Sequence, residues 1–273
     1  MVRILLISVA FSLILSAQSD KLFRVADSLF ISENYFDAIT EYKRVNFYDS
    51  GKMFAYESNY RIGLAYKAGG FFENAIEYFG ASLKNSDTDE RKFSSFVEMI
   101  RCNILRGTPE NGISMINRAI ENGDFTNLTE DLYYWRGWAL MFSDRWKEAS
   151  ASFSRIDVDH PLKKYASDIH NKKYDVTFAK LISYILPGSG QVYAGEYVSG
   201  IMSLGWTVLW GYVTVDAFAS ERVFDGFAVG NLLWFRFYRG NVQNAEKFAL
   251  ERNNEIYREA LLYLQNNFEG IKP

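Results

Sequence analysis

The sequence predicts an all-α protein, in which four helical hairpins stack into a solenoid and are followed by an apolar helical hairpin and an amphipathic helix. Three observations support this prediction. A pattern of small and large apolar residues recurs every 37 residues in the first part of the chain. The composition becomes strongly apolar after Asp175. From Gly240 to the end, apolar residues recur at helical spacing among polar ones.

Residues 1–17 have the features of a secretory signal peptide. Arg3 supplies a short positive region, and Ile4–Leu15 supplies an apolar one. Cleavage after Ala17 is expected, and the alternative is an uncleaved membrane anchor. Either interpretation places the body of the protein outside the cytoplasm.

The composition of the 273-residue chain argues against several classes of function. A formal net charge of −3 offers no general attraction for nucleic acid. The single cysteine, Cys102, excludes an internal disulfide and a cysteine-cluster metal site. His160 and His170 lack the neighbours that metal sites need. We therefore expect no catalytic residue, no metal and no cofactor.

The repeat is defined by three sets of equivalent positions, each repeating at 37 residues. The first set holds small residues: Ala38, Ala75, Gly112 and Ala149. The second set lies twelve residues earlier: Ala26, Gly63, Ile100 and Gly137. The third set lies four residues after the first and is large and apolar: Tyr42, Phe79, Ile116 and Phe153. The first part of the chain is therefore expected to consist of four copies of one structural unit, each of which covers the apolar face of its neighbour.

This pattern resembles the tetratricopeptide repeat over about residues 20–161. The resemblance is clear in Gly63, Ala75 and Phe79, whereas the third unit departs from the pattern at Ile100 and Asn103. The period exceeds the usual 34 residues by about three, so longer connecting turns are expected. The resemblance implies a helical solenoid that binds a protein or peptide partner and catalyses nothing.

In the tetratricopeptide family the first helix of each repeat lines a partner-binding groove. Carried over to this sequence, the resemblance places these residues in the groove: Phe23, Asp27, Phe30, Tyr60, Leu64, Lys67, Arg101, Ile104, Tyr134, Trp138 and Met141. Several are aromatic where solvent alone would favour charge, which indicates a binding surface. The alternative is that they pack against the following helix.

The domain boundaries follow from these segments. Residues 1–17 are the signal peptide, residues 18–161 the repeats, and residues 162–180 a capping or linker helix. Residues 181–239 are a glycine-rich loop with an apolar hairpin, and residues 240–273 are the amphipathic helix.

The apolar hairpin is expected in or on a membrane. Ile201–Ala219 has nineteen residues with one charge, Asp216, and narrowly reaches the length that spans a bilayer. Val223–Tyr238 is shorter and is interrupted by Asp225 and Arg236. A compact soluble bundle is the alternative to membrane association.

Leu186–Gly200, "LPGSGQVYAGEYVSG", precedes this hairpin and is rich in glycine. It lacks the lysine of a phosphate-binding loop and the serine spacing of a nucleophile elbow. It resembles the P-G-x-G-Q-x-Y-x-G pattern of small two-helix bacterial membrane domains. The matching residues are Pro187, Gly188, Gly190, Gln191, Tyr193 and Gly195.

The roles expected within this loop are structural. Pro187 should end the preceding helix, and Gly188 and Gly190 should allow a reversal with positive φ. Gln191 and Tyr193 should bond freed backbone groups.

The charges of the hairpin lead to two further expectations. Asp216 should lie near the Ser220–Gly226 turn, and Arg236 should pair with the glycine-rich loop through Glu196 or backbone carbonyls. Basic residues flank the hairpin, which by the positive-inside rule places the flanks in the cytoplasm. A cleaved signal peptide places them on the opposite side, so the hairpin would then lie shallowly at the membrane surface.

The function expected from the sequence is a non-enzymatic, exported bacterial scaffold for protein–protein interaction, associated with the membrane through residues 181–239. Envelope assembly and membrane-protein insertion are the processes considered. The alternative is a lipid-handling protein, or an accessory subunit of an envelope enzyme, with a ligand pocket in the apolar C-terminal part.

Overall fold

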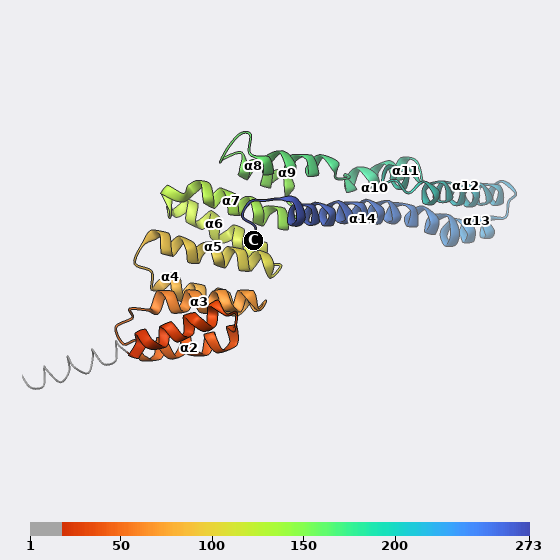
Figure 1. Ribbon diagram of the computed structural model, residues 1–273. Helices are drawn as coiled ribbons and strands as arrows, with labels where there is room; N and C mark the ends of the chain where they lie inside the picture. Colours follow the sequence, from red (N-terminus) through yellow and green to blue (C-terminus); the bar gives the residue numbers. More distant parts are fainter. Residues whose placement is uncertain (1–17) are drawn as a thin grey trace, which may run out of the picture. The chain divides into compact units, whose positions relative to one another are not determined.

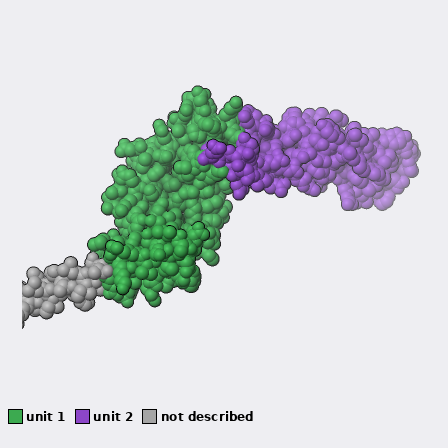
Figure 2. Space-filling model, in the orientation of Figure 1, with its two compact units in different colours: residues 1–167, 270–273 green, residues 168–269 purple. Residues whose placement is uncertain are grey.

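The computed structural model describes residues 18–273, so the predicted signal peptide lies outside the described residues. The described part of the chain consists of helices and short connections and has no strand, which confirms the predicted all-α class. It divides into two compact units, coloured separately in Figure 2. Unit 1 runs to Ser167 and includes Gly270–Pro273, and unit 2 is Asp168–Glu269.

Unit 1 contains four helical hairpins in chain order (Figure 1). Their helices are residues 18–31 with α2 (Tyr35–Tyr48), α3 (Ala55–Ala68) with α4 (Phe72–Lys84), α5 (Asp89–Leu105) with α6 (Pro109–Asn122), and α7 (Thr129–Phe142) with α8 (Trp146–Phe153). A short 3₁₀ turn, η1 (Thr126–Leu128), precedes α7. Contacts of α2 with α3, α4 with α5, and α6 with α7 join each hairpin to the next. This is the predicted helical-repeat arrangement.

The three sets of repeat positions form the interior of unit 1. The small residues of the first set are all buried, and the large side chains of the third set are 0% exposed. At Gly63 an added Cβ would lie 2.7 Å from the ring of Phe79. At Gly137 an added Cβ would overlap the ring of Phe153 in the same way. Glycine is therefore required where each of these aromatic rings lies against the first helix of its hairpin.

The turn inside each hairpin also repeats at 37 residues. One residue per turn has positive φ: Glu33 (61°), Gly70 (77°), Gly107 (79°) and Asp144 (58°). The two glycines adopt this conformation without steric cost, whereas Glu33 and Asp144 have a Cβ that opposes it. The same reversal is therefore used four times, whichever residue occupies the position.

Helix α9 (Pro161–Lys172) follows the last hairpin. Its first half belongs to unit 1, where Leu162 and Ala166 are buried and the Ser150 hydroxyl donates to the carbonyl of Lys163 at 3.0 Å. This half lies against α8, where the rings of Trp146 and Tyr165 also meet with centroids 6.4 Å apart. The predicted segment 162–180 is not one helix, however, because α9 ends at Lys172 and a new helix begins at Val176.

Unit 2 is built around one long helix. Its elements are α10 (Val176–Ile185), α11 (Ser189–Tyr193), α12 (Tyr197–Ala219), α13 (Val223–Val229), the π-helical segment η2 (Gly230–Trp234) and α14 (Phe235–Asn267). Helix α14 contacts α10, α11 and α12, and α13 contacts α12 (Figure 1).

The predicted division at residue 240 is wrong. Helical structure continues from Val223 through η2 to Asn267, and Gly240 lies inside α14. Glycine in a helix interior destabilises the helix by about 1 kcal/mol relative to alanine. Packing of α14 against α10, α11 and α12 stabilises the helix by more than this cost. The second arm of the hairpin and the amphipathic helix are therefore one continuous element.

Candidate functional site

The surface formed by the first helix of each hairpin is the candidate partner-binding site, and we call it the first-helix surface. It comprises residues 18–31, α3, α5 and α7. Eight of the residues predicted to line a groove are half-buried here: Phe23, Asp27, Phe30, Tyr60, Leu64, Lys67, Arg101 and Tyr134.

At the N-terminal end of this surface the side chains pack against neighbouring helices. The ring of Phe23 stacks on Phe54 with centroids 4.8 Å apart. Asp27 accepts a hydrogen bond of 3.0 Å from the hydroxyl of Tyr42. Phe30 lies 5.2 Å from the guanidinium of Arg61. These contacts favour the packing interpretation for Phe23, Asp27 and Phe30.

In the middle of the surface, an acidic residue joins α3 to α5. Glu98 is 6% exposed and accepts from Lys67 Nζ at 2.7 Å and also from Arg101 Nη1. The guanidinium of Arg101 also lies 5.4 Å from the ring of Trp135. Because Glu98 is buried and pairs with both cations, it fixes the orientation of the Lys67 and Arg101 side chains.

Tyr60 lies on the same surface, 5.5 Å from the ring of Phe79 and 5.7 Å from that of Tyr56. Burial raises the pKa of Tyr60 to about 12, so its phenol stays protonated at neutral pH. Leu64 packs against the cluster formed by Ala75, Phe79 and Cys102.

The C-terminal residues Gly270–Pro273, which we call the tail, belong to unit 1 and are not helical. The hydroxyl of Tyr134 donates to the carbonyl of Ile271 at 2.5 Å. Arg101 Nη2 donates to the carbonyl of Lys272 at 3.0 Å. Two residues predicted to bind a partner therefore hold two consecutive main-chain carbonyls of this chain.

The structure contradicts the groove assignment for three residues. Ile104, Trp138 and Met141 are 1%, 2% and 0% exposed. Residues three, four or seven positions apart share one side of a helix, and the family register does not show which of them neighbouring helices bury. These side chains are core and offer a partner no surface.

Sequence reasoning missed Glu98 and the tail. Glu98 had a detectable signal, because it precedes Arg101 by three residues on one helix and such pairs lie side by side. The tail had none, because 137 positions separate Tyr134 from its acceptor.

The remaining titratable candidates have structural surroundings. Cys102 is buried, and burial raises the pKa of its thiol to about 12, which keeps it protonated and unreactive. The ring of His160 stacks on Phe153 at 5.1 Å, and its Nδ1 accepts from the backbone N–H of Leu162. Burial lowers the pKa of His160.

In unit 2 the glycine-rich loop is a turn between packed helices. Pro187 follows the end of α10 at Ile185, as predicted. Gly188 has φ of +92°, and a Cβ there would overlap the carbonyl of Gly200. Gly190 is helical, so its predicted positive φ is wrong; glycine is needed there because a Cβ would overlap Ala179 and Ser183. Gly195 has the second positive φ of the loop, +86°.

Buried polar groups connect this turn to α14. The side chain of Asn241 accepts from the N–H of Gly188 at 2.6 Å and donates to the carbonyl of Ser183 at 2.9 Å. Gln191 donates to the carbonyl of Asn241 at 3.2 Å and to Ser203 Oγ at 2.9 Å. Tyr193 accepts from the backbone N–H of Asp175 at 3.1 Å. Asn241 thus satisfies the two backbone groups that the turn frees, the N–H of Gly188 and the carbonyl of Ser183. Gln191 and Tyr193 bond backbone groups outside the turn instead.

The predicted pairing of Arg236 with this loop is wrong. Arg236 is exposed and has no hydrogen-bond or ion-pair partner among residues 18–273. Asn241 takes the role instead, because its short amide reaches the turn from a buried position on α14. Asp216 lies at the predicted turn, where it pairs with Arg222 at 2.9 Å.

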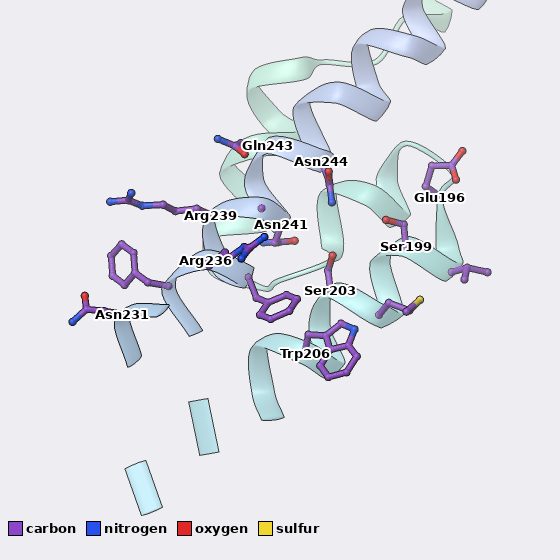
Figure 3. A pocket seen from close by; sticks show the side chains of 15 residues that line it. Glu196, Ser199, Ser203, Trp206, Asn231, Arg236, Arg239, Asn241, Gln243 and Asn244 are labelled. Carbon is purple, nitrogen blue, oxygen red and sulfur yellow. The ribbon is translucent and has the colours of Figure 1, made fainter. Parts of the chain in front are cut away.

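Arg236 borders a cleft of about 900 Å³ between α12 and α14. Figure 3 shows Glu196, Ser199, Ser203 and Trp206 on one side, and Arg236, Asn241 and Asn244 on the other. The ring of Trp206 stacks on Phe237 with centroids 5.6 Å apart, which gives the cleft an aromatic wall beside its basic one.

The apolar residues of α12 and α13 are mostly exposed. Helix α12 has 23 residues and is long and apolar enough to cross a membrane, and only 11% of its most apolar window is buried. The exposed apolar side chains of these helices include Ile201, Met202, Val208, Leu209, Tyr212, Val215, Phe224 and Phe227.

Comparison of the chain with known proteins adds no identification. No protein-family model, curated protein sequence or solved structure matches it.

Proposed function

We propose that this protein is a non-enzymatic, membrane-associated scaffold of the tetratricopeptide-repeat type, exported to the bacterial cell envelope. Unit 1 binds a protein or peptide partner on the first-helix surface, and the apolar hairpin of unit 2 associates with a membrane. Envelope assembly or membrane-protein insertion is the process in which such a scaffold acts.

The observation that carries this proposal is the exposed apolar surface of α12. Val208 and Val215 are 61% and 67% exposed and lie two turns apart on that helix. A water-soluble protein rarely leaves so many large apolar side chains together on its surface. A bilayer removes this cost, because lipid tails cover the side chains while the helix satisfies its own backbone hydrogen bonds.

Flotation with lipid vesicles tests the membrane part. The full chain should float with the vesicles, and the double variant Val208→Glu with Val215→Glu should partition at least about tenfold less, because charge in the bilayer interior is costly. The matched control is Phe36→Glu with Phe47→Glu, which replaces apolar residues of unit 1 that are 82% and 80% exposed. Equal flotation of all three proteins would contradict the proposal.

The partner-binding part is supported by the aromatic and charged side chains of the first-helix surface, and by its resemblance to tetratricopeptide grooves. A photoreactive residue at Tyr60 should crosslink one defined partner in native membranes, and one at Tyr48 on α2 should not. Identical crosslinks from both positions would argue against a specific surface.

Export is supported by the features of residues 1–17. The mature N-terminus, measured by mass spectrometry of the protein from its native host, should begin at Gln18. An intact N-terminus would favour the uncleaved anchor.

The cleft beside Arg236 favours one alternative, a lipid-handling protein. An arginine with no carboxylate partner, next to an aromatic wall, suits a phosphate-bearing lipid head group. Lipid released from the purified protein should then be anionic and should fall several-fold in Arg236→Gln but not in Arg258→Gln, a control further along α14. Unchanged lipid content in Arg236→Gln would contradict the lipid-handling alternative, and the scaffold would remain the only supported function.

A further inference from the structure

The tail is bound by donors that recognise main chain rather than side chains. Tyr134 and Arg101 lie on consecutive first helices, α7 and α5, and donate to the carbonyls of Ile271 and Lys272. Every residue of any peptide carries such a carbonyl. The two donors therefore suit a non-helical segment of many sequences.

Contacts within unit 1 fix the orientation of one of these donors, Arg101, independently of the tail. Arg101 pairs with the buried Glu98, which also pairs with Lys67, and its guanidinium lies against the ring of Trp135. A side chain already fixed in its binding orientation loses little freedom when it accepts a ligand. The arrangement therefore suits any segment that presents a carbonyl at this place, the tail included.

The tail itself is held without deep burial of its apolar side chain. Ile271 remains 67% exposed although it is the most apolar residue of the tail. Ile271 therefore contributes little through burial of apolar area, so another segment with a better-buried side chain at this place can replace the tail.

We propose that the tail Gly270–Pro273 is an intramolecular ligand of the first-helix surface, and that it occupies the place of an extended segment of the partner. The partner is thus a protein that offers a non-helical segment with two consecutive free carbonyls. This inference rests on the proposed function, and it adds that the partner must displace the tail.

The size of the effect follows from tethering. A short tether gives an effective concentration in the millimolar range, so a tail of about 0.1 mM intrinsic affinity weakens a competing peptide roughly tenfold. Deletion of the tail should therefore raise the affinity for a peptide in trans by about that factor.

The test uses a fluorescent peptide with the sequence of residues 268–273, FEGIKP, and the full chain in detergent. The anisotropy titration compares the intact chain with a variant that ends at Glu269. The shortened variant should bind the peptide about tenfold more tightly. Within the shortened variant, Tyr134→Phe should weaken binding several-fold, and Tyr133→Phe, the neighbouring tyrosine on α7, should not.

Two results would overturn the inference: equal peptide affinity of the intact and shortened chains, or binding by the shortened chain that Tyr134→Phe leaves unchanged. Arg101→Gln provides a second donor variant, and its circular dichroism and melting curve show whether α5 remains folded.

The test of the tail inference and the test of the scaffold proposal can fail separately. If crosslinking from Tyr60 captures a partner but deletion of the tail does not increase the yield of crosslinked partner, the scaffold proposal is supported and the tail does not compete with the partner. If the peptide binds the shortened chain but crosslinking from Tyr60 captures no partner, the tail interaction is supported and the scaffold proposal is contradicted.

Discussion

Individual residues of unit 1 have roles that follow from space and backbone conformation. Gly63 and Gly137 are glycines because an aromatic ring, from Phe79 or Phe153, occupies the volume that a Cβ would take. Gly70 and Gly107 are glycines because their φ angles are positive, whereas a Cβ added at either would have open space around it. Glycine is thus required by side-chain packing at Gly63 and Gly137 and by backbone conformation at Gly70 and Gly107.

At the first-set position of the second repeat, Ala75→Leu should destabilise the protein by about 1–3 kcal/mol, because extra methylene groups overpack a filled interior. Ala75 is 0% exposed. The matched control is Ala68→Leu, at an exposed position of α3. Chemical denaturation followed by circular dichroism measures both, and equal midpoints would disprove the repeat register.

At the hairpin turns, Gly70→Ala and Gly107→Ala should each cost about 1 kcal/mol, because a Cβ is opposed in the left-handed region. Gly51→Ala is the control, since Gly51 has open space around it and no positive φ. Thermal melting of the three variants provides the comparison. A Gly51→Ala variant as unstable as the other two would show that the left-handed backbone conformation is not the cause.

His160 should make the stability of unit 1 depend on pH. Burial lowers its pKa from an ordinary value of 6.5, so the folded state prefers the neutral ring and the unfolded state takes up the proton first. The contribution of neutral His160 to the free energy of unfolding is therefore complete above pH 6.5, and it declines as the pH falls below that value. His160→Gln should flatten the dependence of the melting temperature on pH, and an unchanged dependence would contradict this role of His160.

At the scale of elements, the structure differs most from expectation in unit 2. Apolar and polar halves of one helix look like two segments in the sequence, and Gly240 suggests a break between them. Helix α14 nevertheless runs unbroken through Gly240, because α10, α11 and α12 pack along it. Local propensity is weak compared with such packing.

The turn between α10 and α12 depends on one side chain of α14. Asn241 is 1% exposed and satisfies both the N–H of Gly188 and the carbonyl of Ser183. Asn241→Ala leaves two buried backbone groups unpaired and should cost about 1–3 kcal/mol. Asn254→Ala, at an exposed position of α14, is the control in a melting experiment in the same detergent. An unchanged melting temperature for Asn241→Ala would show that the loop does not need it.

At the scale of the whole molecule, the chain folds as two compact units with separate interiors. Ala75 lies in unit 1 and Asn241 in unit 2, and the two residues share no contact partner. The combined variant Ala75→Leu with Asn241→Ala should therefore lose stability additively, to within about 0.5 kcal/mol. A larger interaction energy in the double-mutant cycle, measured by denaturation, would show that the units fold as one.

The sequence by itself determined the helical class, the 37-residue repeat and the residues that fill its interior, because helix packing depends on side-chain size at fixed spacings. It also located the apolar hairpin and the turn that contains Gly188. Which first-helix residues are accessible required the tertiary structure, since Tyr134 and Trp138 lie four residues apart on the same face of α7 and only Trp138 is buried. The structure alone brought Arg101 and Tyr134 to the carbonyls of the tail, and Asn241 rather than Arg236 to the glycine-rich loop. Such contacts join residues that are more than 50 positions apart, and no local pattern records them, because only the folded chain brings them within reach.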